Sequence, residues 1–155
     1  MLMTASQPRV IRRGVSLSHL TVWSGTGGPY AVPVSSVAVE FRGRLGHGSC
    51  YGLLAGELLA EPGPTVSFTY GPPAELPKVA HDVAIAGLEP AYEGAVERAA
   101  RRAQAALRIT AACHGEIGSS QVVFEQLTAV LIALLTQSAY RDEDLWEVWD
   151  TAWRR

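Results

Sequence analysis

The sequence predicts an α+β domain in which helices pack on one face of a mostly antiparallel sheet. Two observations predict this fold class. Strand-like segments, with alternating or β-branched side chains, dominate the first half of the chain, and helix-like segments with apolar stripes dominate the second half. From residue 34 onward the predicted order is four strands, a helix, a strand and two helices. A chain of 155 residues is long enough to bury its own core as a single domain.

The first half contains the predicted strands. Residues 34–42 alternate apolar and polar side chains, as a half-buried strand does. The apolar stretch 53–61 leads into a Pro-Gly turn, after which residues 65–70 are rich in β-branched and aromatic side chains. We expect these two stretches to be antiparallel strands joined by the turn. Another short strand is predicted at 79–87, and residues 1–33 are expected to form an arm or an extra strand.

Helical periodicity begins after a proline that suits the first turn of a helix. Residues 91–106 carry one apolar stripe with charged residues mostly outside it, which predicts an amphipathic helix. Residues 107–113 then alternate as a strand. Ser119 or Ser120 can cap a long helix that ends near residue 138. Because this helix is apolar on most of its faces, we expect it to be the central, buried one.

The chain ends in a tryptophan-rich tail, residues 141–155. Acidic residues near its start suit a helix N-terminus, because the helix macrodipole favours negative charge there. Leu145, Trp149 and Trp153 follow as one apolar stripe. We expect the stripe to dock onto its own domain, and a homodimer through the same three residues is the alternative. Residues 34–140 would then form the core of the domain.

Charge and cysteine content exclude several classes of protein. A net charge of −2 is not that of a domain that binds nucleic acid over its whole surface, so any RNA contact needs a local patch of arginine and histidine. Two cysteines are too few for a disulfide scaffold, and no CxxC pair is present. Charges near the N-terminus precede any apolar run, and no stretch is apolar enough for a membrane span. We therefore expect a cytoplasmic protein with no membrane partner.

Three segments, in order, resemble domain IV of translation elongation factor G and of its ribosome-protection relatives. The first, residues 43–71, has a glycine-rich loop, a long apolar stretch and a Pro-Gly turn. The second, GLEPAYEGAVERA at 87–99, is similar to that family's helix start, and the third, CHGEIGSSQVVF at 113–124, is similar to its His-bearing loop and Ser-capped helix. Order and spacing agree across about 80 residues.

The resemblance implies a split βαβ topology with a left-handed crossover, against the general preference for right-handed ones. It also implies that loops 43–50 and 114–119 meet at one tip, the end that in the elongation factor reaches the ribosomal decoding centre beside transfer RNA. The family's GTP-binding domain and its phosphate-loop motif are missing, so no GTPase activity is implied. A stand-alone, non-enzymatic binding module that contacts RNA or the ribosome is the function this resemblance implies.

On this interpretation no cofactor is needed, and the tip loops supply the binding residues. Arg42, just before the first loop, would add a further cation for phosphate contacts. The residues expected to bind are Arg44, His47, His114, Glu116 and Ser119.

A Cys/His cluster at the same tip gives an alternative function, a small enzyme or a ligand-binding protein. His47, Cys50, Cys113 and His114 are ligand types that suit zinc, but adjacent Cys113 and His114 in a strand would point to opposite faces. Cys50 could instead be a nucleophile with His47 or His114 as its base. Buried thiols and solvated imidazoles without chemical roles are the simpler interpretation, because a cysteine is more often a small core hydrophobe than a nucleophile.

Overall fold

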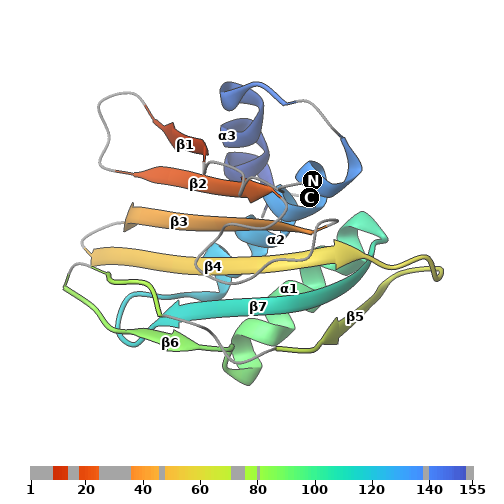
Figure 1. The fold of residues 1–155 in the computed structure, drawn as a ribbon, viewed down its shortest axis with the longest axis horizontal. Coiled ribbons are helices and arrows are strands. Elements are labelled where there is room, and N and C mark those ends of the chain that lie inside the picture. The colour runs from red at the N-terminus through yellow and green to blue at the C-terminus, as the bar shows by residue number, and fades with distance from the viewer. Residues whose placement is uncertain are drawn as a thin grey trace, which may run out of the picture.

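The structure is a computed structural model, and it describes residues 9–13, 18–24, 36–45, 48–70, 76–79, 81–137 and 140–152. At residues 44, 45, 48 and 49 the description is limited to the backbone. Within these ranges seven strands form one sheet, and three helices pack on one of its faces (Figure 1). The predicted α+β class with a mostly antiparallel sheet is confirmed.

The sheet has its longest strands in the middle. Its strands are β1 Arg9–Arg12, β2 His19–Ser24, β3 Val37–Leu45, β4 Gly48–Leu58, β5 Thr65–Phe68, β6 Ala84–Ala86 and β7 Ala106–Gly115. The order across the sheet is β1-β2-β3-β4-β7-β5, and β6 also pairs with β7. All pairs are antiparallel except β5 with β7. Segment 1–33 contributes two strands, where an arm or a single extra strand was expected.

Strands β4 and β5 are antiparallel and joined by the turn, as predicted, but they do not pair with each other. Strand β7 lies between them, antiparallel to β4 and parallel to β5. The turn between β4 and β5 passes around the start of β7, where the Leu59 and Thr65 N–H groups donate to the carbonyls of Ala106 and Ala105 at 2.9 and 3.2 Å. A local turn signal does not reveal that a strand from later in the chain is inserted between its two arms.

The helices are α1 Pro90–Ala103, α2 Gln121–Thr136 and α3 Asp142–Thr151. Pro90 occupies the first turn of α1, and Ser120 caps α2 by accepting a hydrogen bond from the Val123 N–H, as predicted. Helix α1 ends before residue 106 because Gln104 adopts a left-handed φ of 52°. Strand β6 is shorter than predicted, since His81 has a φ of 62° and interrupts the extended chain.

The connection from β5 through α1 to β7 joins two parallel neighbours in the sheet. In Figure 1 both strands run toward the left, β7 lies above β5, and α1 lies behind the sheet. A chain that follows this path makes a left-handed crossover, which is rare among parallel neighbours.

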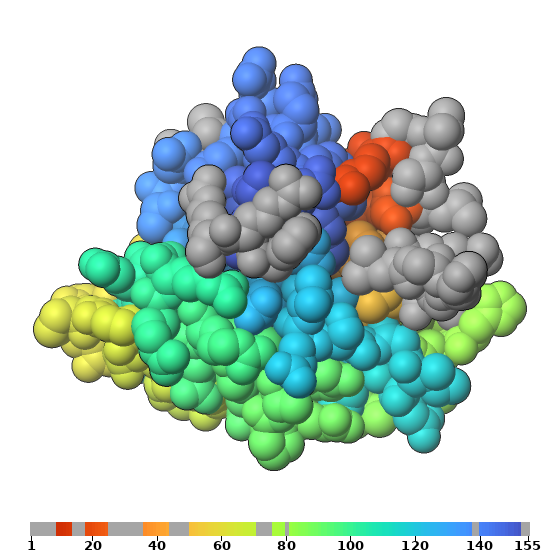
Figure 2. Space-filling view, turned by 180° about the vertical axis from the view of Figure 1, so that it is seen from behind, coloured from red at the N-terminus to blue at the C-terminus, as the bar shows by residue number. Residues whose placement is uncertain are grey.

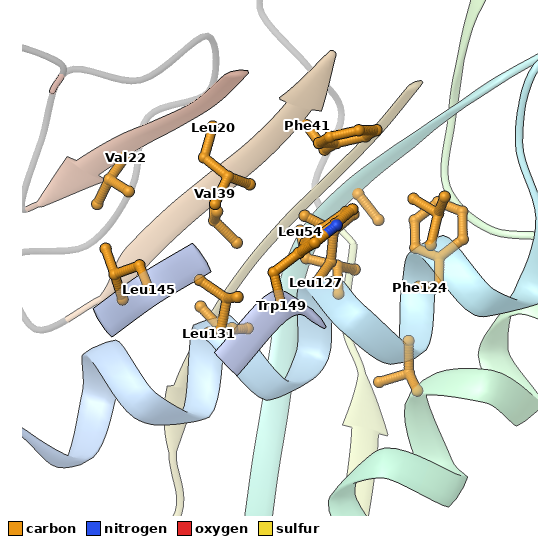
Figure 3. Close-up of a cluster of buried hydrophobic side chains, with 14 of the residues drawn as sticks. Leu20, Val22, Val39, Phe41, Leu54, Phe124, Leu127, Leu131, Leu145 and Trp149 are labelled. Atoms are coloured by element: carbon orange, nitrogen blue, oxygen red, sulfur yellow. The ribbon is translucent and has the colours of Figure 1, made fainter. Parts of the chain in front are cut away.

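The main core lies between the sheet and the helices, which cover its rear face (Figure 2). In Figure 3, Leu20, Val39 and Leu54 of the strands face Leu127 and Leu131 of α2. All five side chains are fully buried. Helix α2 contacts the sheet and both other helices, so it is the central helix, as predicted. No described helix is long and apolar enough to span a membrane.

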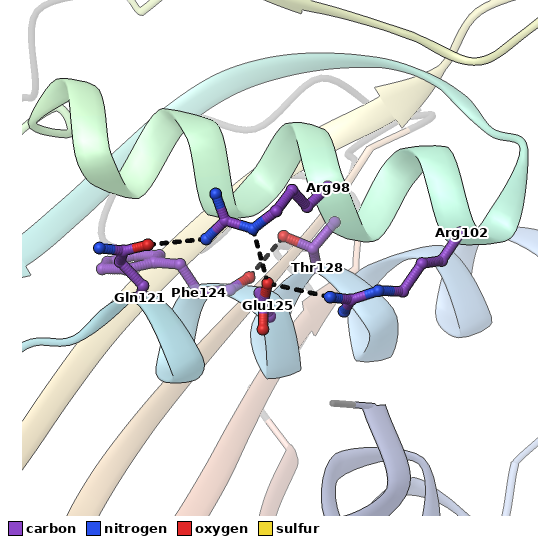
Figure 4. Close-up of polar contacts among 6 residues, drawn as sticks. All are labelled: Arg98, Arg102, Gln121, Phe124, Glu125 and Thr128. Atoms are coloured by element: carbon purple, nitrogen blue, oxygen red, sulfur yellow. Dashed lines mark hydrogen bonds and ion pairs between the residues drawn. The ribbon is translucent and has the colours of Figure 1, made fainter. Parts of the chain in front are cut away.

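A buried carboxylate fixes α1 beside α2 (Figure 4). Glu125 of α2 accepts hydrogen bonds from Arg98 Nε at 3.0 Å and from Arg102 Nη2 at 3.3 Å. Arg98 Nη2 also donates to Gln121 Oε1 at 2.7 Å. Because a buried carboxylate is costly unless it is paired, these contacts select one arrangement of the two helices. The helices run parallel, and both begin at the same end of the sheet.

The tail packs onto its own domain. Leu145 is fully buried and Trp149 is 2% exposed. The Trp149 ring stacks on Phe41 of β3, with centroids 4.3 Å apart and an interplanar angle of 28°. The predicted docking is therefore confirmed for these two residues, whereas Trp153 lies outside the described residues. A homodimer through Leu145 and Trp149 gains no support, because neither side chain is available to a second chain.

Trp149→Ala should lower the free energy of unfolding by about 3–5 kcal/mol, because it removes a buried aromatic side chain and leaves a cavity beside Phe41. Urea unfolding followed by circular dichroism measures this. The control, Val10→Ala on the exposed side of β1, should change stability by less than about 0.5 kcal/mol. Equal, small effects for both variants would contradict the packing of α3 described above.

Candidate functional site

Three segments meet at the end of the sheet where β4 begins and β7 ends. We call this end the tip: the β3–β4 hairpin at 43–50, residues 81–83 and residues 114–119. Gly52 is the register partner of His114, so the start of β4 lies beside the end of β7. The described parts of loops 43–50 and 114–119 therefore lie at the same end of the molecule.

Backbone hydrogen bonds tie these segments together. The Tyr51 N–H donates to the carbonyl of Gly118 at 2.7 Å, and the Glu116 N–H donates to that of Val83 at 2.9 Å. Ser119 adds a side-chain link, because its Oγ accepts from the Gly115 N–H at 2.8 Å and donates to the Tyr51 carbonyl at 2.7 Å. The Ser119 hydroxyl is therefore engaged inside the tip, where it fixes the loop.

Asp82 organises the same loop, and sequence reasoning missed it. Its Oδ1 accepts from the N–H groups of Val83 at 2.8 Å and Ile117 at 3.0 Å, and its Oδ2 accepts from that of Gly118 at 2.8 Å. A Cβ at Gly115 would collide with Oδ2, which explains the glycine there. Desolvation alone would raise the pKa of Asp82, but the backbone N–H donors outweigh it and hold the pKa below its ordinary value.

His114 is not a solvated imidazole at the tip surface. It is 5% exposed, and its Nδ1 lies 2.8 Å from the carbonyl oxygen of Gly87. The ring packs edge-on against Tyr92 of α1, with centroids 5.5 Å apart, and Nε2 lies 3.8 Å from Glu89 Oε1. His114 therefore joins the end of β7 to the start of α1, and its side chain does not reach a partner at the surface.

Arg42 is engaged on the opposite face of the sheet from the helices. Its Nε donates to Glu40 Oε1 at 2.9 Å, and its Nη1 donates to the Lys78 carbonyl at 2.6 Å. Glu40 is 4% exposed and also accepts from the Tyr51 hydroxyl at 2.7 Å. Arg42 neutralises this buried carboxylate, so its guanidinium is not a spare phosphate ligand.

The structure does not describe the side chains of two predicted binding residues, Arg44 and His47. Arg44 lies on β3 with Ser49 as its register partner, but its side chain is outside the description. His47 lies outside the described residues altogether. The Glu116 side chain is exposed on the tip.

The alternative Cys/His cluster is divided between the two faces of the sheet. Cys50 belongs to the core beneath the helices, whereas Cys113 belongs to the buried cluster on the other face. Neighbouring Cys113 and His114 point to opposite faces, as expected for a strand. Burial raises the pKa of the Cys50 thiol to about 11, so it is protonated at neutral pH and is a poor nucleophile. Among the described residues no group of His, Cys, Asp and Glu could hold a metal ion.

The tip presents an apolar apex. Ile117 is 82% exposed, although its backbone is held by Asp82. Val83 is also exposed, and the bond between Val83 and Glu116 brings it beside this loop. Ile117 and Val83 together form a small exposed apolar surface at the tip. The sequence feature that could have indicated this exposure is that Ile117 lies in a short, polar segment with a glycine on each side, Gly115 and Gly118, and this segment has no other apolar side chain to cover it.

No protein-family model, curated protein or solved structure matches this chain.

Asp82→Ala should free the loop, because the N–H groups of Ile117 and Gly118 lose their acceptor. We expect hydrogen exchange at these two amides to accelerate by roughly tenfold, which corresponds to about 1.4 kcal/mol of local stability. Amide-resolved NMR measures the rates. In the control, Glu116→Ala removes an exposed acid from the same loop and should leave both rates unchanged. Unchanged rates in the Asp82 variant would show that the carboxylate does not hold the loop.

The stabilisation by Asp82 should depend on pH in a defined direction. Its pKa is lower in the folded chain than the ordinary 3.8, so the contribution is fully present above 3.8 and is lost as the pH falls toward the folded value. The difference in unfolding free energy between the wild type and Asp82→Ala should be constant at neutral pH and shrink below 3.8. Urea titrations over a pH series measure it, and a difference that grows on acidification would contradict the assignment.

Proposed function

We propose that this chain is a stand-alone, non-enzymatic binding module similar to domain IV of elongation factor G, which contacts structured ribosomal RNA through its tip. The observation that carries the proposal is that the described part of loop 43–50 and loop 114–119 lie at one end of the sheet, where hydrogen bonds hold the second loop in place. The proposal thus combines the sequence resemblance with the position of the two loops it concerns.

The topology supports the resemblance. About 98% of parallel crossovers are right-handed. The β5–α1–β7 connection is left-handed, which is the handedness that the resemblance implies. Agreement on so uncommon a feature is stronger support than agreement on the number of strands and helices.

Helix orientation supports an anionic partner at the tip. The start of α1 lies beside His114, and α2 begins directly after the loop that ends at Ser119. Each helix N-terminus carries a partial positive charge. Glu93 offsets it in the first turn of α1, whereas α2 has no acidic residue in its first turn. The phosphates of RNA would gain from this field, while Ile117 would pack against bases that are not stacked in a helix.

The chemistry of the tip favours binding over catalysis. Catalysis by Cys50 would need a thiolate and a base within reach. The thiol is buried with a raised pKa, and the Nδ1 atom of His114 is bonded to a carbonyl. The side chains of Ser119 and Asp82 are likewise engaged with backbone groups. Side chains used in this way make a rigid surface and leave no poised nucleophile among them.

Co-sedimentation with purified ribosomes tests this function. The wild-type chain should sediment with ribosomes at low salt, and the double variant Arg44→Ala/Ile117→Ser should lose roughly tenfold in affinity. Arg44→Ala alone should lower the slope of log K against log salt by about one if that arginine contacts a phosphate.

The matched control is Arg101→Ala/Leu58→Ser, which removes an exposed arginine and an exposed leucine at the other end of the molecule. It should bind like the wild type. Protein-free ribosomal RNA in place of ribosomes distinguishes an RNA contact from a contact with ribosomal protein. Absence of the wild-type chain from the ribosome pellet at low salt, or equal losses in both double variants, would rule out the proposed function.

A further inference from the structure

A hollow of about 250 Å³ lies between the three helices, away from the tip. It is lined by the last turns of α1, the middle of α2, the end of α3 and Tyr140. Five of its described lining residues are alanines, whose short side chains do not fill the space between the helix axes. Ile132 and Val148 complete largely apolar walls.

One charged group is found among the described residues that line this hollow, the guanidinium of Arg102. Its acidic partner, Glu125, is shared with Arg98, which lies closer, at 3.0 Å against 3.3 Å. Two guanidinium groups therefore face one buried carboxylate, and the arrangement carries a surplus positive charge. Arg102 brings that surplus to the wall of an apolar space.

We propose that the hollow binds a small amphipathic carboxylate, with its apolar tail among the alanines and its carboxylate on Arg102. Small-molecule sites are mostly apolar, and a small number of polar groups in their walls fix the orientation of the ligand. The apolar walls of this hollow would therefore hold an apolar tail. A guanidinium forms its strongest hydrogen bonds with carboxylates, which it can meet with two parallel N–H donors. This ligand site is separate from the tip and does not depend on the function proposed for it.

The volume limits the size of the ligand. A dry cavity of about 150 Å³ accommodates benzene, with its six heavy atoms. By proportion, 250 Å³ accommodates about ten heavy atoms. A monocarboxylate of about eight carbons, counting the carboxyl carbon, has about ten heavy atoms and so matches the volume, and its carboxylate matches the charge of Arg102, so octanoate is the probe of choice.

Isothermal titration of the full chain with octanoate tests the site. Octanol and octylamine have the same tail but lack the negative charge, and both should bind at least about tenfold more weakly, since the charge-assisted contact is lost. If octanol binds as well as octanoate, Arg102 does not select the ligand and the proposal fails. It also fails if octanoate does not bind.

Two variants test the charge and the volume separately. Arg102→Gln removes the surplus charge and leaves Glu125 paired with Arg98, and it should weaken octanoate binding by roughly tenfold. Ala103→Leu places extra volume in the hollow from an exposed position of α1, so the fold is retained and binding should be lost. Arg101→Gln is the matched control, because Arg101 is exposed on the same helix and does not line the hollow, and it should bind octanoate like the wild type.

Thermal unfolding in the presence of octanoate gives an independent reading. A ligand that binds only the folded chain raises its melting temperature. The rise should appear for the wild type and Arg101→Gln and be absent for Ala103→Leu. An equal rise in all three chains would mean that octanoate acts elsewhere, and the site would be rejected.

Discussion

The close approach of helix α2 to strand β4 is the constraint on which the rest of the structure depends. Gly52 lies beneath the helix, where an added Cβ would come within 2.7 Å of Leu127 Cδ1 and 3.1 Å of Val123 Cγ1. A side chain at this position would force the Leu127 side chain or α2 itself to shift. Because the neighbouring residue, Tyr51, holds the backbone of the loop that leads into α2, a shift of the helix would also disturb the tip.

Helix α2 also sets the positions of the other two helices, through buried polar groups on different faces. Toward α1 it presents Glu125, and toward α3 the Gln126 Nε2 donates to the Trp149 carbonyl at 3.0 Å. Each contact is directional, so it fixes a helix at a particular distance as well as a particular angle. The hollow near Arg102 lies between the three helices, where its lining includes five alanines whose side chains are short.

Sequence reasoning succeeded where a feature depends on neighbours along the chain. Alternation predicted β3, and local backbone preferences predicted the roles of Pro90 and Ser120 in starting their helices. It failed where a feature depends on pairing between distant segments. The insertion of β7 between β4 and β5 and the bonds from Asp82 to Ile117 join residues that no short-range period relates.

The burial of His114 was also not predicted, because it depends on contacts between segments that are distant in the sequence. The sequence places it next to a loop, which favours exposure, yet Gly87 and Tyr92 cover it once β6 and α1 return to that end of the sheet. Of the predicted binding residues, the structure uses Ser119 and His114 to build the tip and leaves Glu116 on its surface. Without the strand pairing, the sequence could not show which of these residues hold the tip together and which are exposed on its surface.

The tip contains two acidic residues, Asp82 and Glu116, that would repel the phosphates of the proposed RNA partner. Their surroundings reduce this repulsion. The Asp82 carboxylate accepts hydrogen bonds from three backbone N–H groups, so its charge is partly compensated by fixed dipoles. Glu116 remains as an exposed acid, opposed by the N-terminal field of α2. On the proposed function, phosphate contacts would involve Arg44 and the N-terminus of α2, and Ile117 would pack against bases. Structured RNA is recognised mostly by its shape together with contacts to phosphates and 2′-hydroxyl groups. Such a local contact does not need a basic domain, so it is compatible with a net charge of −2.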